Sequence, residues 1–414
     1  MKTHLDLDAY SLFTCRCETP TREAPRTLFQ TMECVHPDGP VPPTAFWVPI
    51  SALMTDSFRD AQDFRRICNA LGALSHDAET GNECPFAKPG WLRELCNWVA
   101  QQIEPLKFRL TGNFRQLNAS SSFSLIRFET TDAAFWFKAV GAPNLHEYAI
   151  SQALARSLPK YVPTVLATKP EWHGWLMADG GGVTLNDVQD PVAWQTALTT
   201  FANLQIDSIG LEDEFLEAGC QDLRLAALLE SVDPFLDAMA DLMKQQSKVP
   251  PPILSQQQLS DMSSVLKSAL QCLGALRIPD ALGHSDFNPG NIIVGPERCT
   301  FLDWAEAYVG HPFLTFEYFL AHLRKDYPQL APLESELRAS YSRIWISVAS
   351  PEQIAQAYSF SPLIAVYAYA VSSNAWRDPE RLKVPGFPGY LRSLTRRMKQ
   401  EADSIQRWRV ECLN

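Results

Sequence analysis

The sequence predicts an α+β protein in which a strand-rich part is followed by a mainly helical part. Short apolar runs bounded by turn residues, which are typical of strands, fill residues 106–186. From residue 183 to the end, apolar residues recur at the spacing of helices. Two short apolar runs, Ile292–Val294 and Cys299–Leu302, interrupt the helical part and are joined by a tight turn, Gly-Pro-Glu-Arg. We therefore expect an antiparallel sheet, then helices, with one β-hairpin among the helices.

Length and composition restrict the number of domains and the kinds of binding partner that the chain can have. The chain has 414 residues, of which 46% are hydrophobic, so two or three domains with a sizeable core are expected. Its net charge of −11 argues against nucleic-acid binding, which needs a basic surface, and is compatible with a cationic substrate. The N-terminus has no apolar leader and no run of 18 apolar residues occurs, so we expect a soluble, cytoplasmic protein without a membrane segment. The ten cysteines include no C-x-x-C pair, which argues against a zinc site and for reduced thiols.

Residues 1–88 predict a small α+β module. Strand-like runs occur at Tyr10–Arg16, Thr27–Cys34 and Ala45–Pro49, and a helical pattern covers Arg59–Leu74. The module is similar to a Nudix-like fold. The acidic signature of that family is missing, so such a module would be degenerate. We therefore expect a structural or recruiting appendage rather than a hydrolase, and the sequence does not identify its protein partner.

Residues 89–182 predict the strand-rich lobe. The lobe begins with a helix at Trp91–Ile103 and continues with strands at Phe108–Asn118 and Phe123–Thr130. The turn between these strands is rich in small residues, namely Ser120, Ser121 and Ser122. Backbone N–H groups in such a turn can approach phosphates, although serine-rich hairpin turns are common and a Walker-type Gly-Lys-Ser/Thr is missing. The turn is therefore a candidate phosphate-binding loop.

A single cation, Lys138, lies inside the otherwise apolar strand Ala134–Val140. Burying an ammonium group without a partner is costly, so Lys138 requires an anion. The helical pattern that begins at Asn144 places Glu147 in its first turn. An acid is ordinary at that position because the N-terminus of a helix favours negative charge. The order of strand lysine and helix glutamate nevertheless favours a functional ion pair.

The helical part contains five main helical patterns. They cover Pro191–Asp207, Glu214–Met243, Ser255–Leu276, Ser361–Trp376 and about Tyr390–Val410. Ser255 and Ser361 are predicted N-caps, and Pro362 suits a first helical position, where a missing N–H has no cost. The last pattern carries several basic residues, which are more typical of a solvated face than of a functional one.

The hairpin of the helical part carries two acids and an amide. Asp286 and Asn291 lie on the loop before the strand Ile292–Val294, and Asp303 follows the strand Cys299–Leu302. Two strands joined by a tight turn bring Asn291 and Asp303 close together. Hard oxygen ligands of this kind suit Mg²⁺, which needs only one or two carboxylates beside substrate phosphates. Asp286 would then be free to orient a hydroxyl, as phosphoryl transfer requires.

The pattern His-x-Asp-x-x-x-x-Asn at residues 284–291, followed by Asp-Trp at 303–304, resembles the aminoglycoside phosphotransferase family, which groups with choline kinases. The resemblance implies a bilobal protein-kinase-like fold, with an N-lobe at residues 89–182. It implies a helical C-lobe at residues 183–414 that carries the catalytic loop and the acceptor pocket. The implied reaction is Mg²⁺-dependent transfer of the γ-phosphate of ATP or GTP to a hydroxyl of a small molecule.

The resemblance also implies roles for individual residues of the catalytic loop. Asp286 is the expected base for direct transfer, and His284 is expected to pack under the loop and fix it by hydrogen bonds. Asn291 and Asp303 are the expected metal ligands.

In the strand-rich lobe, the resemblance implies nucleotide contacts. Lys138, held by Glu147, would position the inner phosphates. The strand near residues 174–178, followed by an acid and glycines, resembles the hinge of the family, where backbone groups of Met177 and Ala178 would hold adenine.

The sequence departs from the family pattern just after Asp303. His311 and Thr315 stand where the family usually has acids that brace the catalytic loop, so we expect a different brace. Three acids of the helical part could meet a substrate amine or could be ordinary surface and capping residues, namely Glu306, Glu317 and Asp378. The alternative to an enzyme is a nucleotide-binding pseudokinase or scaffold, against which the complete set of expected site residues argues.

Overall fold

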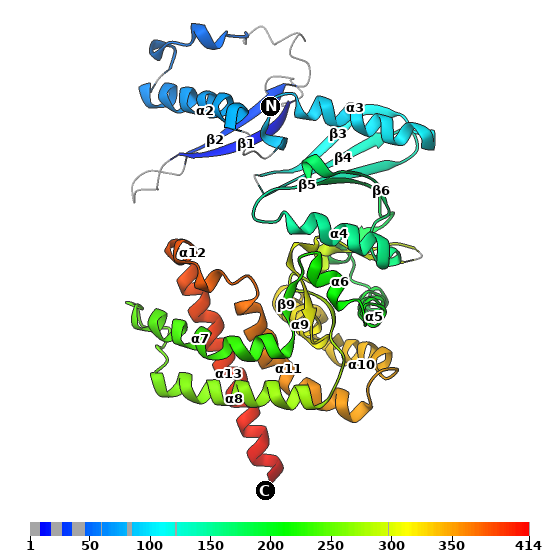
Figure 1. The fold of residues 1–414 in the computed structure, drawn as a ribbon, viewed down its shortest axis with the longest axis vertical. Coiled ribbons are helices and arrows are strands. Elements are labelled where there is room, and N and C mark those ends of the chain that lie inside the picture. The colour runs from blue at the N-terminus through cyan, green and yellow to red at the C-terminus, as the bar shows by residue number, and fades with distance from the viewer. Residues whose placement is uncertain are drawn as a thin grey trace. The chain divides into compact units, whose positions relative to one another are not determined.

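The computed structural model of the protein describes residues 9–17, 27–34, 46–58, 60–80, 85–120, 122–296 and 298–413 (Figure 1). The chain divides into two units, each with its own hydrophobic core. Unit 1 consists of residues 1–148 and 164–179, and unit 2 of residues 149–163 and 180–414. Unit 1 contains an antiparallel sheet and unit 2 is mainly helical, which confirms the predicted α+β class.

A five-stranded antiparallel sheet forms the centre of unit 1, with the strand order β3-β4-β5-β7-β6. The strands are β3 (Leu110–Ala119), β4 (Phe123–Thr130), β5 (Ala134–Val140), β6 (Val165–Lys169) and β7 (Gly174–Ala178). The helix α3 (Trp91–Ile103) buries one side in the same core as Phe137 of β5 and Trp172. The predicted helix and the strands β4 and β5 are confirmed at their predicted bounds, because turn residues delimit the strands clearly and apolar residues recur at helical spacing in α3.

The N-terminal hairpin consists of β1 (Ala9–Cys17) and β2 (Thr27–Cys34), and it shares the core of unit 1. Tyr10 and Leu12 are buried in the core that contains α3. The side-chain amide of Gln116 on β3 accepts from the N–H of Ser11 at 2.7 Å and donates to its carbonyl at 2.9 Å, much as a neighbouring strand would. The predicted division after residues 88 and 182, and the Nudix-like character of the first part, stay predictions.

Two N-terminal elements differ from the prediction. Residues 46–49 are not a strand but lead into the short 3-10 helices Ile50–Ala52 and Thr55–Ser57, and residue 45 lies outside the described residues. Their apolar side chains are exposed, so no sheet partner stabilises an extended run. The helix α2 covers Ala61–Thr80, somewhat later than predicted.

The structure describes nine α-helices that lie wholly within unit 2, and they account for most of its core. They are α5 (Pro191–Asp207), α6 (Glu212–Glu217), α7 (Leu225–Lys244), α8 (Gln256–Ala275), α9 (Phe313–Asp326), α10 (Glu334–Trp345), α11 (Pro351–Val371), α12 (Pro379–Lys383) and α13 (Phe387–Leu413). The helix α4 (His146–Ser157) crosses the division between the units. The predicted bounds of α5 are confirmed, and Ser255 caps α8 with Gln258 in a capping box, as its sequence predicts.

The single helix predicted at Glu214–Met243 is wrong. The structure has α6, the short strand β9 (Gln221–Leu223) and then α7. The break falls at Gly219, whose φ of 106° lies in a region that residues with a side chain rarely adopt. Helical spacing of the apolar residues continues across this break, so periodicity alone does not reveal it.

The predicted start of the helical pattern Ser361–Trp376 is also wrong. The helix α11 begins ten residues earlier, where Ser350 forms a capping box with Gln353 and Pro351 occupies the first turn. Ser361 lies inside α11 and its hydroxyl donates to the carbonyl of Ala357 at 2.9 Å. By length and composition α11 could cross a membrane, but 67% of its apolar window is buried inside the protein, so packing accounts for its apolar character.

The basic residues of α13 have structural partners. Arg392 donates to the carbonyl of Leu242 at 3.2 Å, and Arg396 donates to the carbonyl of Pro252 at 2.7 Å and to Gln246. Cations commonly bind the last carbonyls of a helix, and here they fix the C-terminal end of α7 and the proline loop after it.

Two small sheets in unit 2 position the candidate site. One has the strand order β12-β11-β8, with β8 at Val183–Thr184, β11 at Ile292–Val294 and β12 at Cys299–Phe301. The other has the order β10-β13-β9, with β10 at Ala281–His284 and β13 at Ala307–Gly310. The loop from His284 to Asn291 joins the two sheets.

Candidate active site

The predicted hairpin is present and brings the predicted residues together. β11 and β12 pair antiparallel, with Ile292 opposite Phe301. The N–H of Leu302 donates to the carbonyl of Asn291 at 2.9 Å, which places Asp303 directly beside Asn291. The loop itself is anchored by Phe287, which is fully buried and packs against Phe201 with ring centroids 4.0 Å apart and the rings tilted.

Two amides hold the carboxylate of Asp286. Asn288 donates to Oδ1 at 2.9 Å and Asn291 donates to Oδ2 at 3.0 Å. Asn288 also accepts from the N–H of Gly290 and so caps the short helix Pro289–Asn291. The Asn-Pro pair is a recognisable capping signal, but the sequence interpretation did not assign Asn288 to the site. The carboxylate of Asp286 is therefore fixed in direction by two neutral donors.

Asn291 and Asp303 fit a magnesium ion. The amide nitrogen of Asn291 is engaged by Asp286, so its amide oxygen is the atom available to a cation. Asp303 has an exposed side chain and a φ of 62°, a left-handed conformation that Asp tolerates but that costs free energy. Among the described residues no three His, Cys, Asp or Glu side chains are grouped to hold a metal, and Mg²⁺ beside phosphates requires only one or two carboxylates.

His284 lies under the loop, as predicted. It is fully buried, and its Nε2 lies 3.0 Å from the carbonyl of Leu302, the residue before Asp303. Its ring packs on Trp304 with centroids 4.9 Å apart, and Trp304 donates to the carbonyl of Phe301 at 3.1 Å. The histidine of the loop and the tryptophan after Asp303 thus tie the two halves of the site together.

Uncharged groups brace the loop where the family usually has acids. The N–H of His284 donates to Oγ1 of Thr315 at 2.9 Å, and that hydroxyl pairs with the hydroxyl of Tyr308 at 2.8 Å. All three residues are fully buried. The ring of Tyr308 lies over Gly283, where an added Cβ would come within 2.0 Å of it. The expected difference in bracing is therefore a Thr–Tyr hydroxyl pair.

His311 takes no part in that brace. Burial lowers the pKa of His311 to about 3, so the imidazole is neutral, and its Nδ1 accepts from the N–H of Phe313 at 3.3 Å. An acid at this position would have to be buried with its charge, whereas a neutral ring packs there without one.

The predicted ion pair is present in unit 1. Lys138 on β5 and Glu147 in the first turn of α4 form a salt bridge, and both side chains are buried. The ammonium group also lies 5.4 Å from the ring centroid of Phe123 and 5.9 Å from that of Trp175. The role of this pair toward a nucleotide stays a prediction.

The serine turn between β3 and β4 is closed by its own hydrogen bonds. The N–H of Ser120 donates to the carbonyl of Phe123 at 3.2 Å, and the N–H groups of Ser122 and Phe123 reach Oγ of Ser120 at 3.3 Å. Ser121 lies outside the described residues. The phosphate-binding role of this turn stays a prediction, and it requires these long contacts to be exchanged for phosphate.

The predicted hinge residues lie at the end of β7, and their contacts with adenine stay a prediction. Met177 lies within β7, between β5 and β6, opposite Trp136 and Val165. The N–H of Ala178 donates to the carbonyl of Thr164 at 3.0 Å, so this donor is engaged within unit 1. Thr164 directly precedes β6, and this contact could not be read from the strand pattern alone.

The glycines after the hinge have a packing role in unit 2. An added Cβ at Gly182 would lie 2.3 Å from the carbonyl oxygen of Val294, and one at Gly180 would lie 3.3 Å from the Ile293 side chain. The close approach lets β8 pair with β11, opposite Ile293 and Val294. These glycines thus join the segment after β7 to the hairpin of β11 and β12.

Of the three acids considered for a substrate amine, two have structural partners. Glu317 is buried and pairs with Arg338 at 3.3 Å, and burial raises its pKa. Asp378 caps α12 by accepting from the N–H of Glu380 at 2.9 Å. Glu306 differs, because its backbone carbonyl accepts from the N–H of Ser285 at 3.0 Å, directly beside Asp286.

The carboxyl of Glu306 lies among other acids. Burial among protein atoms raises its pKa, and the charges of Asp286 and Asp303 raise it further. The residue keeps exposed surface, so repulsion from the two aspartates matters alongside desolvation.

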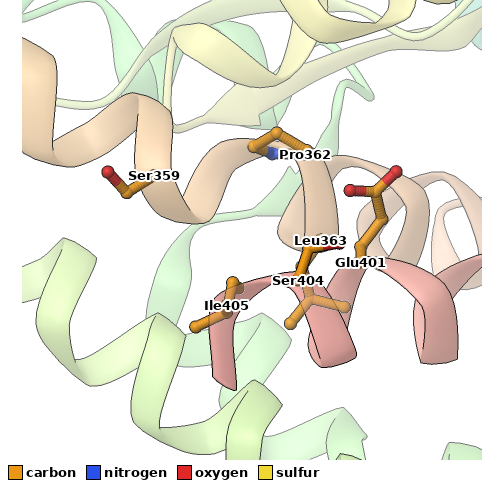
Figure 2. Close-up of a pocket in the computed structure, with 6 residues that line it drawn as sticks. All are labelled: Ser359, Pro362, Leu363, Glu401, Ser404 and Ile405. Atoms are coloured by element: carbon orange, nitrogen blue, oxygen red, sulfur yellow. The ribbon is translucent and has the colours of Figure 1, made fainter. Parts of the chain in front are cut away.

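One surface cleft lies between α11 and α13 (Figure 2). It has a volume of about 220 Å³ and is lined by Ser359, Pro362, Leu363, Glu401, Ser404 and Ile405. None of the predicted site residues lines it, so it is separate from the hairpin of β11 and β12.

The raised pKa of Asp280, just before β10, predicts that the free energy of unfolding depends on pH. Burial raises its pKa from 3.8 to about 6, opposed by Arg224 and aided by Glu212 and Asp222. The folded state therefore binds the proton more tightly than the unfolded state, and stability falls as the pH rises from about 4 to about 6.

We expect Asp280→Asn to be more stable than the natural chain at pH 7.5, by about 2 kcal/mol, and equally stable at pH 4. Urea unfolding at both pH values measures the difference, with the exposed Asp237→Asn as the control. A stability gain that is the same at both pH values would contradict the ionisation argument.

Comparisons with known proteins give a family and a set of distant structures. The sequence model of the phosphotransferase enzyme family matches residues 114–345, which is more than half of the chain. No curated protein matches the sequence.

Three solved structures illustrate the structural likeness. The macrolide 2'-phosphotransferase MphH of Brachybacterium faecium is 16% identical over 70% of this chain and 99% of its own, with a TM-score of 0.43. The ethanolamine kinase of Plasmodium vivax is 13% identical over 69% and 82%, with a TM-score of 0.48. The choline kinase LicA of Streptococcus pneumoniae is 11% identical over 75% and 99%, with a TM-score of 0.44.

Proposed function

We propose that this chain, which belongs to the phosphotransferase enzyme family, transfers the γ-phosphoryl group of ATP or GTP to a hydroxyl of a small molecule, with Mg²⁺. The observation that carries the proposal is the hairpin of unit 2. There Asp286 is oriented by two amides, and Asn291 presents its oxygen beside Asp303. We place the reaction in the cytoplasm, with a small molecule as the partner.

Asp286 acts on the acceptor. Its two oxygens accept from Asn288 and Asn291, which fixes the carboxylate in one orientation while its remaining lone pairs face a hydroxyl. The hydroxyl oxygen attacks the γ-phosphorus, the bond to the nucleoside diphosphate breaks, and the hydroxyl proton passes to Asp286. Positioning of the acceptor supplies much of the rate, because there is little covalent chemistry for the protein to perform.

The other predicted residues hold the nucleotide and its metal. Asn291 and Asp303 would bind Mg²⁺, which supplies charge neutralisation at the phosphate oxygens. Lys138 would contact the inner phosphates, and Glu147 keeps its ammonium group in place. His284 acts through the loop, since it binds the carbonyl before Asp303 and no reacting atom.

The hydroxyl pair of Thr315 and Tyr308 predicts a kinetic effect. Thr315→Val removes the acceptor of the His284 N–H and leaves two buried polar groups without a partner. We expect kcat to fall by roughly tenfold or more with little change in the KM for nucleotide, because the loop is displaced rather than the nucleotide lost.

Steady-state kinetics with matched variants test the brace. Thr315→Ser keeps the hydroxyl and should restore most of kcat. Thr395→Val removes another fully buried hydroxyl, which bonds only within α13, and should leave kcat unchanged. Equal kcat values in Thr315→Val and the natural chain would contradict a positioning role.

A screen of acceptors tests the proposed function. Sugars, amino alcohols, aminoglycosides and nucleosides are combined with a non-hydrolysable nucleotide and Mg²⁺, and the melting temperature is recorded, because ligands of the folded state raise it. Compounds that raise it are then offered with ATP or GTP, and phosphorylated product is measured. Nucleotide binding without any phosphorylated product would favour the pseudokinase or scaffold alternative.

A further inference from the structure

Residues 46–58 of unit 1, which we call the apolar segment, expose an unusual number of large apolar side chains. Five of them, within nine positions, are 43–79% exposed, namely Phe46, Trp47, Val48, Ile50 and Met54. Single apolar residues are common on protein surfaces, but five so close together form a patch. Because exposed apolar patches mark interaction sites, the apolar segment is a candidate interface.

The apolar segment has a defined local shape. The carbonyls of Pro49 and Met54 accept from the N–H groups three residues later, at 2.9 and 3.0 Å, and each bond closes one of the two 3-10 helices. The ring of Phe58 packs on that of Phe64 in α2, with centroids 5.7 Å apart. A surface that already has its shape loses less conformational entropy when a partner binds.

Neither hydrophobic core accounts for these side chains. Of the residues described between 46 and 80, none belongs to the core of unit 1 or to that of unit 2. The helix α2 follows the same pattern, because no side chain described in it is buried. The N-terminal hairpin differs, since its Tyr10 and Leu12 are buried in the core of unit 1. Packing within one chain therefore does not explain why the segment is apolar.

The charges of the apolar segment restrict what can cover it. The segment contains one acid, Asp56, and no lysine or arginine. Surfaces that bind membranes or nucleic acids carry basic residues that attract phosphates, and this chain has a net charge of −11. A partner surface that is itself apolar and nearly uncharged suits the segment better. The same segment of a second copy meets this requirement, and symmetric dimers bring identical surfaces together.

The area of the patch matches the size of a dimer interface. At their exposed fractions the five side chains present roughly 600 Å² per chain, since a large aromatic side chain contributes about 150–250 Å² when fully exposed. Two copies would bury roughly 1,200 Å² in total, which reaches the lower limit for stable interfaces. Phe64 and Ile67 of α2 are also partly exposed and would add to this area.

We propose that the apolar segment is the interface of a homodimer, in which it packs against the same segment of a second copy. Trp47 and Ile50 are its main anchors, because a few large buried side chains carry most of the binding energy of an interface. The interface lies outside residues 114–345, which match the family model, and contains no residue of the candidate active site. The inference is therefore independent of the proposed function.

Sedimentation velocity over a range of protein concentrations tests the dimer. The mass of the natural chain should rise from one chain to two as the concentration rises. Trp47→Ala should raise the dissociation constant of the dimer by roughly 30-fold or more, as the loss of an interface anchor does. Val249→Ala changes another exposed apolar residue, in the proline loop, and should leave the constant unchanged. A single-chain mass at every concentration, or equal constants for Trp47→Ala and the natural chain, would overturn the inference.

Cross-linking identifies the surfaces that meet in the dimer. The variant Ile50→benzoylphenylalanine carries a photoreactive side chain, and the cross-linked peptides are identified by mass spectrometry. We expect a cross-link from position 50 of one chain to residues 46–80 of the other. Cross-links between chains that reach only other parts of the second chain would contradict a self-paired segment.

Vesicle binding distinguishes the dimer from a membrane anchor. The natural chain and Trp47→Ala are sedimented with vesicles of phosphatidylcholine alone and with added phosphatidylserine. We expect neither protein to bind either kind of vesicle. Binding by the natural chain that is lost in Trp47→Ala would overturn the inference in favour of a membrane surface. Failure of the proposed phosphoryl transfer would leave all of these results unchanged, because no step of these experiments requires turnover.

Discussion

Asp286→Asn is expected to lower kcat by roughly 10²–10⁴-fold, the range that a general base contributes. An amide of the same shape cannot take the hydroxyl proton, and it offers only one oxygen to the two amides that now bind Asp286. The KM for nucleotide should change little, because Asp286 acts on the acceptor. Initial rates of nucleoside diphosphate release in the presence of acceptor measure the effect.

Two controls accompany Asp286→Asn. Circular dichroism and the melting temperature show whether the variant is folded. Asp237→Asn changes an exposed acid of α7 and should keep full activity. A folded Asp286→Asn protein with the natural kcat would rule out Asp286 as the base.

Asp303→Ala is expected to abolish turnover at ordinary Mg²⁺ concentrations, with a loss on the order of 10³-fold or more. The substitution removes the one carboxylate that fits the metal beside Asn291, and with it several kcal/mol of charge stabilisation in the transition state. Raising the Mg²⁺ concentration should restore part of the rate. A titration of the initial rate with Mg²⁺ measures this shift.

The left-handed backbone at Asp303 calls for a second variant. With a φ of 62°, alanine at this position is strained as well as lacking the carboxylate. Asp303→Gly lacks the carboxylate without that strain. Both variants should lose activity alike, and an active Asp303→Gly would show that backbone geometry, not metal binding, is the reason for an acid here.

The fold could be predicted where local signals agree with one another. The strand β4 alternates in burial, β5 is an almost continuously buried apolar run between clear turns, and α8 starts at a complete capping box at Ser255. Such elements need no knowledge of tertiary contacts. The hairpin of β11 and β12 belongs to the same class, because two apolar runs flank a Gly-Pro turn.

The elements whose bounds were predicted wrongly depend on contacts between residues distant in sequence, or carry two similar helix-start signals of which only one is used. α11 contains Ser-Pro twice, and the structure uses the pair at Ser350, where Gln353 completes the cap and donates to the carbonyl of Leu276. The strand β9 forms only because β13 pairs with it, which apolar spacing does not reveal.

The site could be predicted in its charged residues and less well in its neutral ones. Lys138 and Glu147 have to meet because a buried ammonium needs an anion, and they do. Asn288 and Tyr308 act through hydrogen bonds that only the folded loop creates. The N–H of Ala178 donates to the carbonyl of Thr164, which local sequence signals do not reveal, and the adenine contacts of the hinge stay a prediction.

Phosphoryl transfer at the hairpin of unit 2 is tested most directly by Mg²⁺-dependent product formation in the natural chain and in Asp303→Ala. Both proteins are incubated with ATP and an acceptor found in the screen, with Mg²⁺ or with EDTA, and the phosphorylated acceptor is quantified. We expect product only from the natural chain with Mg²⁺. Equal product from folded Asp303→Ala, or from the natural chain in EDTA, would contradict the assignment of the site.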